Sequence, residues 1–276
     1  MHLIGAIERR FAAIVSQMSQ WDPQSLLSRF NRAPAGCWLA LPQDFATVLG
    51  AGLDIAERTG GAFDPTHGRA AALLGFGAVT VDRPPTRGEL DEAFESTGWQ
   101  RLALDRTSRR VRQPGGLWLD LSAIAKGFAA DAVSHLLAEQ GVEDALVEIG
   151  GELVGRGLRP DGQPWWVDVE DPPGVALPPL RIGLHEIAIA TSGDYVRGAH
   201  TLDPRTGRPL GASVISASVV HESAMMADGW ATALTVLGPE AGIAVATRED
   251  LSARLVTRSR DATERISPRL ARMIEA

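Results

Sequence analysis

The order in which hydrophobic periodicities follow one another constrains the fold of this chain most strongly. Proline and glycine residues delimit two expected helices over 42–59 and 86–96, and over residues 4–18 apolar residues recur every three or four positions, as on one face of a helix. From Trp99 onward they fall instead into short strand-like runs between turn residues. Helices interrupt these runs only at irregular intervals, whereas a doubly wound parallel sheet needs regular alternation. The order predicts an α+β fold with a mixed, largely antiparallel sheet and flanking helices.

The predicted elements after Trp99 are nine strands and three helices. The strands are expected at residues 101–104, 110–112, 117–119, 145–149, 153–156, 165–169, 187–190, 214–220 and 254–256, and the helices at 123–140, 222–237 and shortly after Pro239. Thr86 and Glu89 have the spacing of a capping box. The proline-rich stretch 161–179 is interpreted as a surface loop around one strand, so residues 1–276 are expected to form a single domain.

Composition excludes several classes of protein. The chain is 45% hydrophobic and 22% charged, as globular proteins are, and it carries 27 basic against 34 acidic residues for a net charge of −7. It therefore lacks the basic footprint of a nucleic-acid binder. Its only cysteine, Cys37, excludes an internal disulfide and a cysteine-based zinc site.

Neither a membrane span nor a signal peptide is predicted. No stretch approaches the ~20 apolar residues of a span. Charges at Glu8, Arg9 and Arg10 fall where a signal peptide has its apolar centre. No cysteine near the start could carry a lipid. The chain as given is expected to be cytoplasmic, although a protein trimmed of an export signal would have the same sequence.

Two motifs combine glycines or a helix start with charged residues. In Gly60-Gly-Ala-Phe-Asp64 the glycines let the backbone approach a ligand closely, and Asp64 either caps the next helix or contacts that ligand. In the stretch from Asp120 to Lys126 an acid precedes a helix start and a lysine lies in its first turns, an arrangement suited to phosphate. The alternative is an ordinary cap and a solvated lysine.

Three further motifs are weaker when taken singly. Gly150-Gly151 indicates a bulge or a close backbone approach. His200 lies beside Asp203 and Arg205 in a loop bounded by glycine and proline, where catalytic groups concentrate. Asp228 and Thr232 are hard oxygen donors on one helix face, which suits Mg²⁺, but Mg²⁺ needs further ligands and an internal hydrogen bond would explain the pair as well.

In their order along residues 19–238, these segments resemble the ApbE family, the FAD:protein FMN transferases. The resembling segments are Ser19-Gln-Trp21, Ser25–Asn31, Gly61-Ala-Phe-Asp-Pro-Thr66, Gly75-Phe-Gly77, Asp120-Leu-Ser-Ala-Ile-Ala-Lys-Gly127, Gly150-Gly151, Thr191-Ser-Gly-Asp-Tyr195, His200-Thr-Leu-Asp-Pro-Arg-Thr-Gly207 and Ala227-Asp-Gly-Trp-Ala-Thr232. Each segment alone is a weak indication, and together in this order they are specific.

The resemblance implies a reaction and a set of site residues. Enzymes of this family split FAD at its pyrophosphate, move FMN onto a Thr or Ser hydroxyl of an acceptor flavoprotein and release AMP, with Mg²⁺. By position in the motifs, the residues implied to hold the metal are Asp228, Thr232 and the carbonyl of Ala123, those implied to contact the flavin nucleotide are Trp21, Ala62, Phe63, Asp64, Asp120, Lys126, Ser192 and Gly193, and the implied catalytic base is His200.

The chain departs from the family pattern at a few places. The family usually begins with a strand carrying Met-Gly-Thr that touches the flavin, and this chain starts at the helix that follows. Residue 152 is Glu where Asn or Asp is more common, and residues 201–202 are Thr-Leu where branched aliphatics are usual. Family acceptors carry an Asp followed by a Ser/Thr-Gly-Ala-Ser/Thr segment. In this chain Thr206-Gly207 is followed by Arg208-Pro209, so self-modification is not expected.

Two other functions remain open at this point. One is a flavin-binding protein without transferase activity, and the other is a Mg²⁺-dependent FAD pyrophosphatase that gives FMN and AMP with water as acceptor. The retained His200, Asp228 and Thr232 favour catalysis over binding alone.

Overall fold

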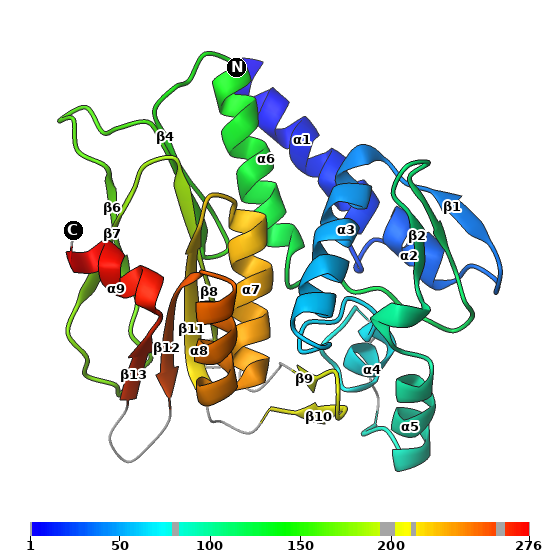
Figure 1. Cartoon of the computed structure of the whole chain (residues 1–276). Helices are drawn as coiled ribbons and strands as arrows, with labels where there is room; N and C mark the ends of the chain where they lie inside the picture. Colours follow the sequence, from blue (N-terminus) through cyan, green and yellow to red (C-terminus); the bar gives the residue numbers. More distant parts are fainter. Residues whose placement is uncertain (1, 79–82, 194–201, 211–213, 258–262, 276) are drawn as a thin grey trace. The chain divides into compact units, whose positions relative to one another are not determined.

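A computed structural model describes residues 2–78, 83–193, 202–210, 214–257 and 263–275 (Figure 1). The chain packs into two compact units that interleave along the sequence. The first unit comprises residues 1–8, 126–201 and 209–276, and the second comprises residues 9–125 and 202–208. Helices and antiparallel strands build both units, which confirms the predicted α+β class.

The first unit is built on a six-stranded sheet in the order β13-β12-β11-β8-β5-β4. Every pairing in this sheet is antiparallel. Its strands are β4 (Ala145–Ile149), β5 (Glu152–Arg156), β8 (Ile187–Gly193), β11 (Val214–His221), β12 (Ser252–Thr257) and β13 (Thr263–Ile266). The central strand β11 is buried on both faces except at its last residue, because helices cover one face of the sheet and a β-hairpin covers the other.

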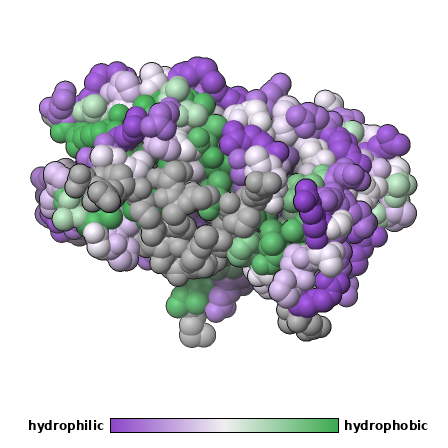
Figure 2. All heavy atoms as spheres, turned by 90° about the horizontal axis from the view of Figure 1, so that it is seen from below, coloured by the Kyte–Doolittle hydropathy of each residue, from purple (hydrophilic) through white to green (hydrophobic). Residues whose placement is uncertain are grey.

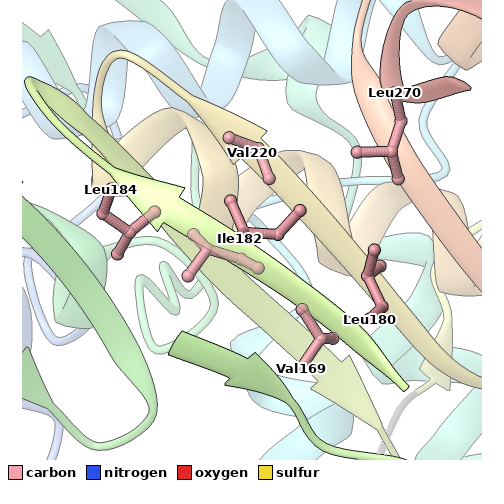
Figure 3. Close-up of a cluster of buried hydrophobic side chains, with 7 residues drawn as sticks. Val169, Leu180, Ile182, Leu184, Val220 and Leu270 are labelled. Atoms are coloured by element: carbon pink, nitrogen blue, oxygen red, sulfur yellow. The ribbon is translucent and has the colours of Figure 1, made fainter. Parts of the chain in front are cut away.

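Two layers cover the sheet. On one face α7 (Ala224–Leu237) packs against β8 and β11, and α8 (Pro239–Arg248) packs against β12. On the other face lie the hairpin of β6 (Trp165–Val169) and β7 (Leu180–Leu184) and the helix α9 (Pro268–Glu275). Figure 3 shows Val169, Leu180 and Ile182 of the hairpin directed toward Val220 of β11 and Leu270 of α9. This apolar cluster fixes the hairpin on the sheet.

The second unit contains helices and a small sheet. Its elements are most of α1 (His2–Met18), α2 (Leu26–Asn31), α3 (Gln43–Arg58), α4 (Gly68–Leu73), α5 (Arg87–Glu95), the 3₁₀ turn η1 (Trp99–Arg101), the three-stranded sheet of β1 (Trp38–Ala40), β3 (Arg110–Arg112) and β2 (Ala103–Asp105), and β9 (Leu202–Asp203), which pairs with β10 (Arg208–Pro209). The capping box predicted at Thr86 and Glu89 is present at the start of α5. Phe30, Phe45 and Ile55 are fully buried in this unit.

The structure corrects several predicted elements. The strand expected at 117–119 is absent, and only an isolated bridge joins Trp118 to His67, because the backbone there bonds to two other segments instead. The strand at 252–257 is not the last one, since β13 follows it. Sequence periodicity also missed β7 and the short helices α2 and α4.

None of the helices formed by the described residues could span a membrane. Seen from below, hydrophilic side chains cover much of the surface and hydrophobic ones gather in separate patches between them (Figure 2).

Candidate functional site

In the second unit, backbone hydrogen bonds join two of the predicted motifs. The amide of Asp120 donates to the Pro65 carbonyl at 2.9 Å, and the amide of Gly68 donates to the Trp118 carbonyl at 3.1 Å. A Cβ at Gly68 would lie 2.9 Å from the Leu119 carbonyl oxygen, so only glycine permits this approach. The Gly-Ala-Phe-Asp segment and the Asp120 segment therefore lie side by side.

The carboxylate of Asp64 stabilises its own loop by accepting three hydrogen bonds. Its Oδ1 accepts from the Thr66 amide at 2.8 Å and the Thr66 hydroxyl at 2.6 Å, and its Oδ2 accepts from the Trp99 amide at 3.1 Å. Asp64 does not cap α4, whose N-cap residue is His67. The side chains of Ala62 and Phe63 belong to the core of this unit.

A third segment joins the same cluster through Gln20. Its side-chain amide donates to the Ser122 hydroxyl at 2.8 Å, and Ser122 donates through both its amide and its hydroxyl to Asp120 Oδ1. The neighbouring Trp21 is 63% exposed, which is unusual for so large an apolar side chain. Ala123 follows in the same turn, before α6 (Ala125–Glu139). The second unit thus gathers Trp21, Asp120, Ala123 and the segment of Ala62 to Asp64.

In the first unit, a lysine and two acids form a charged cluster on three elements. Lys126 of α6 forms a short hydrogen bond with Glu152 of β5, and its Nζ lies 3.9 Å from Oδ1 of Asp228 on α7. The Gly127 amide donates to Asp228 Oδ2 at 3.1 Å. The side chains of Glu152 and Asp228 are almost completely buried, while Lys126 is 40% exposed.

Gly150-Gly151, for which a bulge or a close backbone approach is predicted, forms the turn of a tight hairpin. Both glycines have positive φ, of 66° and 101°, and they link the paired residues Ile149 and Glu152. A Cβ at Gly150 would lie 3.4 Å from Lys126 Cδ. The turn therefore brings the backbone close to the lysine stem and places Glu152 at its Nζ.

Burial perturbs both acids of the cluster. Burial, and then the negative charge of Asp228, raise the pKa of Glu152 to about 7, against the opposing effect of Lys126. Burial also raises the pKa of Asp228, although Lys126 and the Gly127 amide favour its charged form. Two buried carboxylates thus share one ammonium group, and further positive charge would stabilise them.

The donor set around Asp228 fits a hard cation. Glu152 Oε2 is buried and accepts no hydrogen bond. Thr232 lies one helical turn beyond Asp228 on α7 and is partly exposed. Within the described ranges no three His, Cys, Asp or Glu side chains gather as metal ligands, so a cation here would need hydroxyl, carbonyl or water oxygens as well.

Other predicted site residues lie apart or outside the described residues. Ser192 and Gly193 end β8 and pair with Ala217 and Ser216 of β11. Asp194, Tyr195 and His200 fall outside the described ranges. Asp203 accepts two hydrogen bonds from the Arg205 guanidinium, both at 2.9 Å.

Glu152 is not among the site residues predicted from the sequence. Its only distinguishing feature there is that the resembling family more often has Asn or Asp at this position. The available indication was an acid placed directly after the Gly-Gly pair, which becomes informative only once the hairpin brings it to Lys126.

The chain is similar to known flavin transferases over nearly its whole length. Residues 2–255 match the model of the ApbE family. The FAD:protein FMN transferase of Vibrio cholerae is 37% identical over 92% of this chain and 79% of its own length, and that of Haemophilus influenzae is 33% identical over 92% and 78%.

Two solved structures agree with these sequence matches. The flavin transferase ApbE from Vibrio cholerae superposes with a TM-score of 0.92 at 36% identity, over 99% of this chain and 90% of that one. The apo form of the Pseudomonas stutzeri flavinyl transferase ApbE gives 0.91 at 34% identity, over 99% and 88%.

Proposed function

The chain belongs to the ApbE family, and on this premise we propose that it transfers FMN from FAD to a Ser or Thr hydroxyl of an acceptor flavoprotein and releases AMP. The observation that carries the proposal is the cluster of Lys126, Glu152 and Asp228, which combines a partly exposed lysine with two buried carboxylates that a cation would stabilise. Reactions at a pyrophosphate depend on such charge neutralisation and positioning.

We propose that the reaction depends on Mg²⁺, held by Asp228, Thr232 and the Ala123 carbonyl. The buried and unpartnered Glu152 Oε2 supports a cation at this place. When bound, Mg²⁺ neutralises pyrophosphate charge and stabilises the AMP leaving group. Lys126, whose side chain is partly exposed, supplies a further positive charge near the phosphates.

The remaining roles in the proposed reaction are binding of the flavin nucleotide and removal of the acceptor proton. Trp21, Asp120 and the segment of Ala62 to Asp64 orient the flavin nucleotide, together with Ser192 and Gly193. His200 removes the proton from the acceptor hydroxyl, because a hydroxyl is a weak nucleophile at neutral pH. The hydroxyl oxygen then bonds to the FMN phosphorus, the bond from that phosphorus to the AMP oxygen breaks, and AMP leaves.

We also propose that residues 1–276 work as one transferase domain. The family match runs from residue 2 to residue 255 and so covers most residues of both units.

Product analysis separates this function from its two alternatives. The chain is incubated with FAD and Mg²⁺, with and without an acceptor protein carrying an Asp followed by a Ser/Thr-Gly-Ala-Ser/Thr segment. A transferase releases AMP only when the acceptor is present, and no matching free FMN appears. A pyrophosphatase releases AMP and free FMN in equal amounts without acceptor. A binding protein leaves FAD unchanged in both incubations.

A further inference from the structure

We propose that Asp131 is a positioning residue that sets where α7 presents Asp228 and Thr232. Asp131 lies on α6, outside every motif considered above, and it does not touch the charged cluster itself. Its role rests on how it holds the start of α7. The inference deepens the proposed function, because it gives the cation site a support on a second helix.

The carboxylate of Asp131 accepts three hydrogen bonds from the N-cap and the first turn of α7. Its Oδ1 accepts from the Ala224 amide at 2.8 Å, and its Oδ2 accepts from the Met225 amide at 3.0 Å and from the Ser223 hydroxyl at 2.6 Å. The first amides of a helix have no partner within the helix. One side chain of α6 therefore satisfies two of them and also bonds the N-cap residue.

A second contact, at Gly127, holds α6 and α7 close together. Gly127 lies one turn before Asp131 on α6, and a Cβ there would collide with the Ala224 backbone. The Gly127 amide reaches Asp228 Oδ2 from this position. Asp131 and Gly127 thus contact α7 at successive turns, around Ala224 and at Asp228.

This arrangement controls both the axial position and the rotation of α7. Ala224, Asp228 and Thr232 are spaced by four residues and share one face of the helix. A slide or a turn of α7 at its first residues would carry Asp228 away from Gly127 and Lys126. Residues that orient metal ligands in this indirect way typically contribute 10–100-fold to metal affinity.

The test compares Asp131→Asn with Thr86→Ala. Thr86→Ala removes a helix cap of α5 in the second unit and so controls for the loss of a cap as such. The first readout is amide hydrogen exchange at Gly127 by NMR, and the second is the Mg²⁺ dissociation constant by titration calorimetry with MgCl₂ on FAD-saturated protein. In Asp131→Asn we expect faster exchange at Gly127 and a Mg²⁺ dissociation constant raised by about tenfold or more. Thr86→Ala should change neither.

Unchanged exchange at Gly127 in Asp131→Asn would overturn the proposal, and so would equal effects in Thr86→Ala. If Asp131→Asn does not fold, Ser223→Ala removes one of the three bonds to Asp131, together with the bond that Ser223 accepts from the Met226 amide, and should show a change of the same kind. Absence of Mg²⁺ binding in the unmutated protein would instead contradict the proposed cation site. Exchange at Gly127 would still decide the role of Asp131 in that case.

Discussion

The amide of Gly127 donates a hydrogen bond to the carboxylate of Asp228, a residue 101 positions later in the chain. The bond joins the first turn of α6 to the middle of α7, and it requires a glycine because the Ala224 backbone fills the space that a side chain would need. The position of the acid on which the proposed cation site depends is therefore set by close helix packing.

Gly127→Ala should destabilise the protein and impair transfer together. The added methyl group forces α6 and α7 apart, and overpacking of this kind costs about 1–3 kcal/mol. Gly88→Ala is the matched control, because Gly88 lies on α5 with open space around it and should gain up to about 1 kcal/mol. Urea denaturation of both variants checks this, and a Gly127→Ala variant as stable as the unmutated protein would contradict the packing described.

Asp228→Ala should abolish transfer and leave the fold intact. A methyl group cannot replace a carboxylate ligand of a small Mg²⁺ site. Removal of a buried acid with a raised pKa also relieves a desolvation cost. Transfer rates at limiting Mg²⁺ and thermal unfolding test both statements.

Thr235→Ala serves as the control for Asp228→Ala, since Thr235 is buried on the same helix and donates only to the Ala231 carbonyl. It should keep the Mg²⁺ dependence of the unmutated protein. If Asp228→Ala transfers at the normal rate at limiting Mg²⁺, Asp228 is a structural helix residue.

Lys126 and Glu152 should be energetically coupled. Lys126→Met leaves a buried carboxylate without its partner, whereas the double variant with Glu152→Gln removes both charges. Because Lys126 is 40% exposed, we expect a coupling free energy of about 1–2 kcal/mol, below that of a fully buried pair. A double-mutant cycle by urea denaturation measures it, and additive effects within about 0.3 kcal/mol would show that the pair is not coupled.

His200→Ala should keep FAD affinity and lose rate. Loss of a positioned base typically lowers a rate by ~10²–10⁴. The pH–rate profile of the unmutated protein should rise through one group near neutrality, and the variant should lack that rise. Fluorescence titration with FAD supplies the second measurement. Weak FAD binding at a near-normal maximal rate would assign His200 to cofactor binding instead.

The sequence predicted the fold class and the local motifs because these depend on neighbouring residues. The capping box at Thr86 and Glu89 and the boundaries of α6 and β4 follow from periodicity and caps over a few positions. The absent strand at 117–119 shows the limit of this reasoning. Its backbone forms hydrogen bonds with Asn31 and Gly68, which are distant in the sequence. The residues of the segment itself do not indicate these bonds.

The site shows the same division. The sequence selected Lys126 and Asp228 singly, but Glu152 enters the cluster only because a two-residue turn places it at Lys126. Nothing in the sequence singled out Asp131, because acidic residues are common within helices. Its importance becomes visible only in the structure, where the first amides of α7 donate to its carboxylate.

The proposed transfer is tested most directly by the intact mass of an acceptor protein after incubation with this chain, FAD and Mg²⁺. We expect the acceptor to gain one covalent FMN group, and the gain to be lost when its Ser/Thr-Gly-Ala-Ser/Thr segment has alanine in place of the modified hydroxyl residue. An acceptor of unchanged mass, with FAD either intact or hydrolysed to free FMN and AMP, would contradict the proposed transfer.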